Sequence, residues 1–189
     1  MKIIIFDTET TGLLKPKAVP LSEQPKIIEL GAVHLNHKQR VIKTISQLLD
    51  PQETLPSIIT KITGITNKDL VGMPTFREYF PKLEKFFKGA DMLVCHNAPF
   101  DVGMLQVELR RMQHVVPGMH LIFPKEIVCT VQEYAPQLGK WPKMEELYQH
   151  ITGNSLTQAH RALDDCIALL EILIVDKFFE KVINDTIAT

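Results

Sequence analysis

Runs of apolar residues without helical periodicity mark the first half of the chain as rich in strands. Residues 3–6 are continuously apolar and mostly β-branched, which is typical of a strand buried on both faces. The polar residues 36–40 separate two further apolar runs and predict a hairpin. Three prolines predict that residues 13–25 form a loop without regular structure. The predicted strands cover residues 2–6, 27–35, 41–49 and 91–95.

Helical signals dominate the rest of the chain. Thr75 is a suitable N-cap and Gly89 a suitable stop, while Pro99 suits a first helical position because its missing N–H is not needed there. Strands followed by helices that alternate with at least one more strand predict an α/β fold, a mixed sheet flanked by helices. The predicted helices cover residues 55–62, 66–70, 75–88, 99–113, 126–136, 143–151 and 158–181.

Composition adds few constraints to this picture. A chain of 189 residues with 45% hydrophobic residues can bury a full core, and we expect a single domain over residues 1–189. The formal net charge of −1 neither supports nor excludes a nucleic-acid partner. Three dispersed cysteines without a CxxC pair indicate core residues in a reducing compartment. With no signal peptide or membrane span visible, we expect a cytoplasmic protein without membrane contact.

Two acids at the end of the first apolar run are the first candidates for chemistry. In a strand, residues i and i+2 share one face, so Asp7 and Glu9 are predicted to point into the same small volume. Two carboxylates at that distance raise each other's pKa unless a cation lies between them. Oxygen-only sites of this kind suit Mg²⁺ or Mn²⁺. The pair therefore predicts half of a metal site.

Two later segments place further acids beside histidines. Asp101 falls in the first turn of a helix that follows a strand, which is where α/β sheets place ligands. Near the last helix, Asp165 shares the shoulder of the apolar face, whereas Asp164 lies farther from it, so Asp165 is the preferred inward-facing acid. His160 is predicted to precede the regular turns of that helix and to face the acids.

Three motifs now stand in order: Asp7-x-Glu9-Thr-Thr-Gly, His-Asn-x-x-Phe-Asp101 and His160-x-x-x-x-Asp165. Together they resemble the exonuclease motifs of the DEDDh family, which includes the proofreading ε subunit of bacterial DNA polymerase III, oligoribonuclease and RNase T. The resemblance covers nearly the whole chain. It implies a 3′→5′ exonuclease on a ribonuclease H-like fold that releases nucleoside 5′-monophosphates.

The resemblance also implies roles for these residues. Asp7, Glu9, Asp101 and Asp165 would hold two divalent ions, Mg²⁺ with Mn²⁺ able to substitute, with Asp7 as the bridge. Such ions clamp the attacking and leaving oxygens of an in-line displacement. His160 would take the proton of the attacking water, since an unperturbed imidazole has a pKa of about 6.5.

Four positions are implied to bind the terminal nucleotide. Thr10 and Leu13 would contact the sugar and the last base, and Phe100 would stack on or abut that base. Thr63 stands where many relatives have His in a His-Gly-Ile segment, so one substrate contact differs here. Trp141 is interpreted as core or loop packing rather than a stacking platform, although the lysines beside it remain candidates for phosphate contact. His96 is a candidate either to support a metal ligand or to contact the substrate.

Several functional alternatives stay open on sequence grounds. DNA 3′ ends, single-stranded or frayed, are the favoured substrate, and the alternative is an exoribonuclease acting on short oligoribonucleotides or tRNA ends. A non-catalytic nucleic-acid-binding module on the same fold is disfavoured because all four acids and the histidine are present. A polymerase or replication partner is a further expectation: a stand-alone enzyme, or one that recruits its polymerase by surface contact, is favoured over an ε subunit. The sequence gives no oligomeric state.

Overall fold

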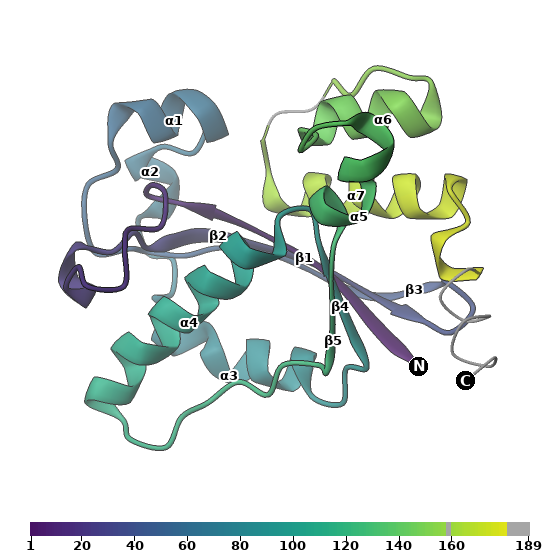
Figure 1. Cartoon of the computed structure of the whole chain (residues 1–189). Coiled ribbons are helices and arrows are strands. Elements are labelled where there is room, and N and C mark those ends of the chain that lie inside the picture. The colour runs from purple at the N-terminus through teal and green to yellow at the C-terminus, as the bar shows by residue number, and fades with distance from the viewer. Residues whose placement is uncertain (158–159, 181–189) are drawn as a thin grey trace.

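A five-stranded mixed sheet forms the centre of the protein in the computed structural model, which describes residues 1–157 and 160–180 (Figure 1). The strand order is β3-β2-β1-β4-β5. β1 pairs antiparallel with β2 and parallel with β4; β3 extends the antiparallel side and β5 the parallel side. The strands are β1 (Lys2–Thr10), β2 (Ile27–Asn36), β3 (Val41–Leu48), β4 (Met92–Cys95) and β5 (Glu126–Cys129).

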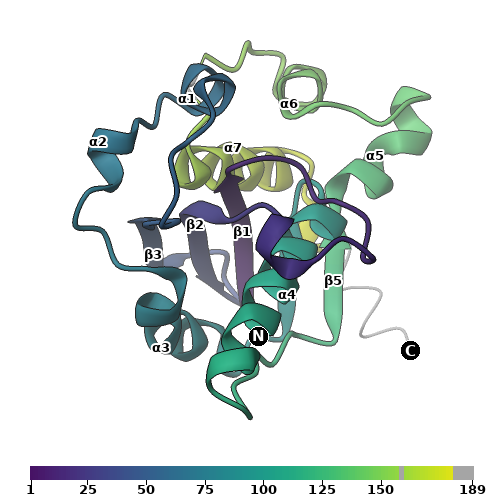
Figure 2. The same cartoon turned by 90° about the vertical axis from the view of Figure 1, so that its left-hand side faces the viewer.

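Helices cover both faces of this sheet (Figure 2). α3 and α4 pack on one face, and α7 packs on the other with α5 and α6 beside it. α1 and α2 pack through a small separate cluster that includes Ile28 of β2. The helices are α1 (Ser57–Thr63), α2 (Asn67–Leu70), α3 (Phe76–Phe87), α4 (Ala98–Val115), α5 (Thr130–Leu138), α6 (Met144–Thr152) and α7 (Ala162–Val175).

The alternation of side chains along β1 decides which face each of its residues meets. Ile4 and Phe6 belong to the core cluster under α3 and α4, whereas Ile3 and Ile5 belong to the cluster under α7. Successive strand residues point to opposite faces, so Asp7 and Glu9 continue the α7 side. Thr8, between them, is directed to the α4 side.

Most of the predicted elements are confirmed, and the fold matches the predicted mixed sheet flanked by helices. β1 is longer than predicted, so that Asp7 and Glu9 lie within the strand rather than after it. The predicted helix over residues 126–136 is wrong in its first part. Residues 126–129 form β5 and pair with β4, because the partner strand supplies the backbone hydrogen bonds that a helical turn would otherwise make.

Two other boundaries differ from the prediction. The helix predicted over residues 158–181 runs only from Ala162 to Val175 as α7; Gln158, Ala159 and residue 181 lie outside the described residues. Lys177 has a φ of 55°, which a regular helix does not accommodate. The proline-rich loop contains one short 3₁₀ turn, η1 (Leu21–Glu23).

No helix in the described part of the chain is long and apolar enough to cross a membrane.

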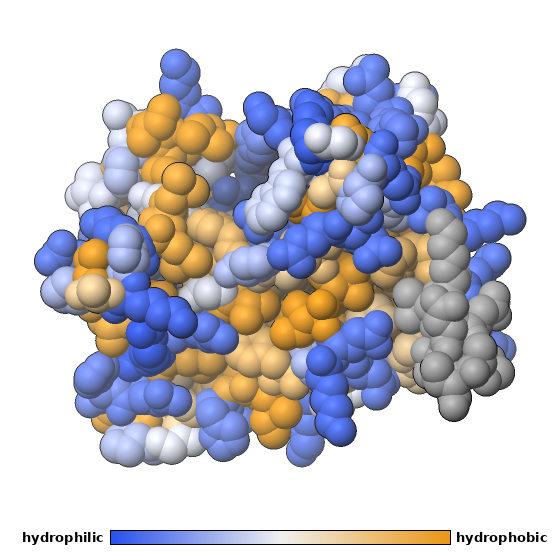
Figure 3. All heavy atoms as spheres, viewed as in Figure 1, coloured by the Kyte–Doolittle hydropathy of each residue, from blue (hydrophilic) through white to orange (hydrophobic). Residues whose placement is uncertain are grey.

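Seen from the same side as Figure 1, the surface is hollowed between the part that carries α1 and the part that carries α6 (Figure 3). The three cysteines are buried and unbridged, as predicted.

Candidate active site

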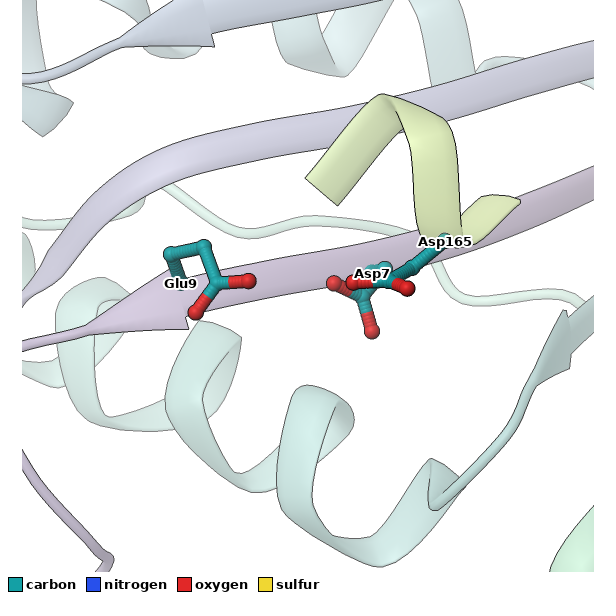
Figure 4. Close-up of side chains that lie close together, drawn as sticks. All are labelled: Asp7, Glu9 and Asp165. Atoms are coloured by element: carbon teal, nitrogen blue, oxygen red, sulfur yellow. The ribbon is translucent and has the colours of Figure 1, made fainter. Parts of the chain in front are cut away.

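Three acids from two distant segments converge on the α7 side of the sheet. One carboxylate oxygen each of Asp7, Glu9 and Asp165 lies within 4.8 Å of the other two (Figure 4). The first two come from β1 and the third from the first turn of α7. Asp164, the neighbouring acid, is exposed, so the preference for Asp165 as the inward-facing residue agrees with the structure.

Asp101 joins this group from the opposite layer. It lies in the first turn of α4, is 2% exposed, and its Oδ1 accepts a 2.8 Å hydrogen bond from the Thr8 hydroxyl. Asp101 is not one of the three acids within 4.8 Å, but its charge raises the pKa of Asp7. Because side chains alternate along β1, Asp7 points to the face where Asp165 lies, and Thr8 points to the opposite face, where it hydrogen-bonds Asp101.

The electrostatics of the cluster indicate what would complete it. Burial raises the pKa of Asp7 well above its usual range, and the charges of Asp101, Asp165 and Glu9 raise it further. Burial, followed by the charge of Asp165, raises the pKa of Glu9 to about 8. Burial raises that of Asp101 to about 7 although the Thr8 hydrogen bond opposes the shift. Burial and the negative charge of neighbouring carboxylates disfavour the ionised form of these acids. Because they offer oxygen donors alone, they fit divalent Mg²⁺ or Mn²⁺, whose positive charge would stabilise that form.

The start of α7 reaches the acids because its backbone packs closely against the backbone of β2. Gly31 of β2 lies opposite Asp7. A Cβ added at Gly31 would come within 2.1 Å of the Ala162 carbonyl carbon, so a larger residue could not let α7 rest on the sheet there. The absence of a side chain on Gly31 therefore allows Asp165 to reach Asp7.

A buried ion pair holds the same turn. Glu29, 1% exposed, lies opposite Glu9 in the register and accepts hydrogen bonds from the Arg161 guanidinium and from the Ala162 backbone N–H. The Nη2–Oε1 distance is 2.7 Å. Sequence reasoning missed Glu29, Gly31 and Arg161, although Arg161 directly follows His160.

A cavity of about 640 Å³ opens over the acids. His160 lines it as an exposed residue two positions before α7, which agrees with its predicted place ahead of the regular turns. The lining residues are Asp7, Thr8, Glu9, Leu13, His96, Asn97, Phe100, Asp101, Lys143, Met144, Glu145, Leu156, His160 and Asp165.

The four predicted substrate contacts divide into two groups. Leu13, 81% exposed, and the half-buried Phe100 line the cavity. Thr10 and Thr63 are buried and are not among its lining residues. The Thr10 hydroxyl donates to the Gly12 carbonyl at 2.7 Å. The Thr63 hydroxyl donates to a carbonyl one turn earlier in α1, so in this structure both hydroxyls are engaged with backbone.

His96 is held by two hydrogen bonds, whereas Trp141 is exposed to solvent. His96 Nε2 lies 3.1 Å from the Pro142 carbonyl and so acts as the donor, while Nδ1 lies 3.1 Å from the Thr130 hydroxyl. Burial lowers the pKa of His96, which favours this neutral form. Trp141 is 66% exposed, so the interpretation that it packs in the core or a loop is wrong.

Comparison with known sequences agrees with this geometry. The chain matches the model of the exonuclease family (RNase T) over residues 4–173. It is 37% identical over 171 residues to a PolC-type DNA polymerase III of Clostridium perfringens, covering 90% of this chain and 11% of that protein. It is 35% identical over 167 residues to the DNA polymerase III ε subunit of Treponema pallidum, covering 88% and 72%. The chain spans only about a tenth of the PolC-type relative.

Solved structures share the fold. The nuclease domain of 3′hExo, described as a DEDDh family member and bound to rAMP, superposes with a TM-score of 0.69 at 19% identity, covering 93% of this chain and 92% of that one. Exonuclease X in complex with 5′ overhanging duplex DNA gives a TM-score of 0.63 at 24% identity, covering 92% and 89%. These likenesses confirm the predicted ribonuclease H-like architecture.

Proposed function

Because this chain belongs to the exonuclease family, we propose that it hydrolyses single-stranded or frayed DNA from the 3′ end and releases nucleoside 5′-monophosphates. The observation that carries the proposal is the convergence of Asp7, Glu9 and Asp165, with ligand atoms within 4.8 Å, in a cavity that His160 also lines. A solvated acidic surface would not raise the pKa of its carboxylates through burial, as happens at Asp7 and Glu9.

The four acids would hold two divalent ions, Mg²⁺ with Mn²⁺ able to substitute. Bound there, such ions stabilise the attacking and leaving oxygens of phosphodiester hydrolysis. Asp7 would contact both ions, as the family resemblance implies, and the charges of Asp101, Asp165 and Glu9 all raise its pKa. The Thr8 hydroxyl keeps Asp101 oriented toward the same point.

His160 acts as the general base of this reaction. It lines the acid cavity and is exposed, so it can accept a proton from the attacking water and release it to solvent. Leu13 and Phe100 take the terminal base, since both line the cavity beside the acids. A hydrophobic contact and a π-face accept any base, which suits an enzyme without sequence preference.

Hydrolysis of matched oligonucleotides tests the proposal. DNA and RNA strands of one sequence, labelled at the 5′ end, should be shortened stepwise from the 3′ end, with the DNA degraded faster. Support for DNA comes from the relatives, which are named as DNA polymerase III chains. Faster RNA hydrolysis would transfer the assignment to an exoribonuclease. Asp7→Ala should abolish either activity, and full activity in that variant would refute the site.

We further propose that the protein works with a replicative polymerase. In the PolC-type relative the matching segment is 11% of a polymerase chain, and another relative is named as a polymerase subunit. Affinity purification of the tagged chain from its own cells, followed by identification of bound proteins, tests this. A polymerase recovered in fixed ratio supports the proposal, whereas recovery of the chain alone favours a stand-alone enzyme.

A further inference from the structure

The loop between α5 and α6, residues 139–143, is fixed at both ends and at its centre. Gly139 ends α5 with a φ of 68°, a conformation that favours glycine. Glu146 of α6 accepts hydrogen bonds from the Lys140 ammonium and, at 3.0 Å, from the Lys143 backbone N–H. Both ends of this segment, called here the Trp141 loop, are thus tied to the helix that follows it.

His96 joins the centre of the Trp141 loop to the wall of the acid cavity. Its Nε2 donates to the Pro142 carbonyl, and its Nδ1 accepts from the hydroxyl of Thr130, which is fully buried. Since His96 itself lines the cavity, the loop cannot move far without disturbing that wall. The loop therefore forms part of the rim of the candidate active site.

Trp141 remains in solvent although its loop is hydrogen-bonded to α6 and to His96. Its side chain is 66% exposed, whereas the next residue, Pro142, is buried. A large aromatic ring gains most from burial, so a firmly held loop that leaves it in water is unexpected for a packing residue. Lys143, two positions on, lines the acid cavity. Two residues span at most about 7 Å of extended backbone, so the backbone of Trp141 lies close to that of Lys143 at the rim of the cavity.

Resting on the proposed function, we propose that Trp141 and Lys143 form a subsite for the nucleotide immediately 5′ of the bond to be cleaved. The indole stacks on its base and the ammonium pairs with a backbone phosphate. Aromatic rings with cations beside them recognise single strands without reading sequence, because every base has a π-face and every nucleotide a phosphate.

The position of Trp141 distinguishes this subsite from the one for the terminal nucleotide. Leu13 and Phe100 line the cavity directly beside the acids, whereas Trp141 is not among its lining residues. A ring outside the cavity, two residues from a lysine that lines it, is placed to meet the strand beyond the terminal nucleotide. The subsite therefore governs affinity for strands and not the hydrolytic step.

Two substrates that share the terminal nucleotide test the proposal. In the p-nitrophenyl ester of thymidine 5′-monophosphate, p-nitrophenol replaces the upstream nucleotide, so its hydrolysis does not use the subsite. Trp141→Ala should raise KM for a single-stranded oligonucleotide about 5- to 150-fold, as expected for about 1–3 kcal/mol of stacking, and leave kcat/KM for the ester unchanged. Trp141→Phe should retain most of the affinity, and Ile122→Ala, which removes another exposed apolar side chain, should change neither substrate.

If Trp141→Ala lowers kcat/KM equally for both substrates, Trp141 contacts the terminal nucleotide. If KM for the oligonucleotide does not change, Trp141 does not contact the strand. Either result overturns the subsite. If the wild-type protein hydrolyses neither substrate, the proposed function fails instead, and the two failures are distinct.

Fluorescence provides a second measurement because Trp141 is the only tryptophan of the chain. In the His160→Gln variant with Mg²⁺, where hydrolysis is slowed, a short oligonucleotide should quench its emission and thymidine 5′-monophosphate should not. Lys143→Gln should reduce the salt dependence of oligonucleotide binding by about one phosphate contact, a slope change of about 0.7, with Lys88→Gln as a control. Quenching by the mononucleotide, or an unchanged salt slope, contradicts the assignment.

Discussion

Asp164 and Asp165 are adjacent residues with the same side chain, and the structure assigns them different environments. Asp165 lies within 4.8 Å of Asp7 and Glu9, whereas Asp164 is exposed. We predict that Asp165→Asn lowers kcat for oligonucleotide hydrolysis by at least about 10³-fold, because one acid of the proposed metal site is neutralised. Steady-state kinetics with saturating Mg²⁺ measures this.

The matched variant is Asp164→Asn, which removes the same charge from the next residue. It should retain activity within about threefold of wild type, since surface substitutions of this kind change little. Comparable losses in the two variants would show that net charge, rather than position in the cluster, decides activity.

Sequence reasoning succeeded at residues whose place follows from the period of a regular element. The alternation of β1 was enough to place Asp7 and Glu9 together, and the helical period was enough to choose Asp165. It failed at Trp141 because loop residues have no regular period from which burial can be predicted. In this loop the Pro142 carbonyl accepts a hydrogen bond from His96, and the Trp141 side chain is left exposed. The roles of Thr10 and Thr63 as substrate contacts stay predictions.

At the scale of elements, the ion pair of Glu29 and Arg161 joins β2 to the start of α7. Arg161→Gln would leave the Glu29 carboxylate, 1% exposed, without its cation. We predict a destabilisation of about 1–3 kcal/mol, less than the roughly 3–5 kcal/mol of a fully buried pair because the Arg161 side chain is 41% exposed. Thermal unfolding measures it, and kcat should fall as well, since His160 adjoins Arg161.

A double variant separates the causes of that effect. Glu29→Gln together with Arg161→Gln removes both charges and should recover part of the lost stability, because no buried ion remains unpaired. Lys140→Gln, which breaks an ion pair between more exposed side chains, should leave the unfolding temperature nearly unchanged. If the double variant is less stable than the single one, the pair contributes through packing rather than charge.

Gly31 makes the second connection between β2 and α7. In Gly31→Ala the new methyl group would meet the Ala162 carbonyl carbon at 2.1 Å and the Leu163 nitrogen at 2.4 Å, both backbone atoms. We predict that α7 shifts, that stability falls by about 1–3 kcal/mol, and that Mn²⁺ binds more weakly as Asp165 moves from Asp7. Calorimetric titration with Mn²⁺ and thermal unfolding check both effects. Gly12→Ala, where nothing lies within 4 Å, should leave the unfolding temperature nearly unchanged.

Elements with a local sequence signal were predicted within a few residues, whereas β5 and the order of the strands, which depend on distant partners, were not. The hairpin of β2 and β3 and the capped helix α3 carry their own turn and cap signals. β5 has four residues and becomes a strand only through pairing with β4. The sheet order, with β1 between β2 and β4, likewise rests on contacts between residues far apart in sequence.

At the scale of the whole molecule, the fold concentrates negative charge that its net charge of −1 does not reveal. β1, α4 and α7 bring Asp7, Glu9, Asp101 and Asp165 to one region, and burial with mutual repulsion raises the pKa values of the first three. The arrangement opposes folding in the absence of cations and is relieved by their binding. Stability should therefore depend jointly on pH and on divalent ions.

We predict that the metal-free protein loses stability as pH rises from about 5 to about 8. Unfolded Asp and Glu have pKa values of about 4, whereas folded Glu9 and Asp101 have values of about 8 and about 7. Over this range the folded state binds more protons than the unfolded state, so the free energy of unfolding falls as the pH rises. A net loss of about 2 kcal/mol would lower the unfolding temperature by about 4–8 °C.

Saturating Mg²⁺ or Mn²⁺ should reverse this trend, because the ionised acids then have cations to neutralise them and binding stabilises the folded state. Thermal unfolding with EDTA and with Mg²⁺ across the pH range measures both slopes, and Asp7→Asn provides the control, since removing the central charge should flatten each of them. Sodium chloride at matched ionic strength separates ion binding from screening. If the metal-free protein instead becomes more stable toward pH 8, the buried acids are already neutralised by groups of the chain, and the proposed metal site loses its electrostatic basis.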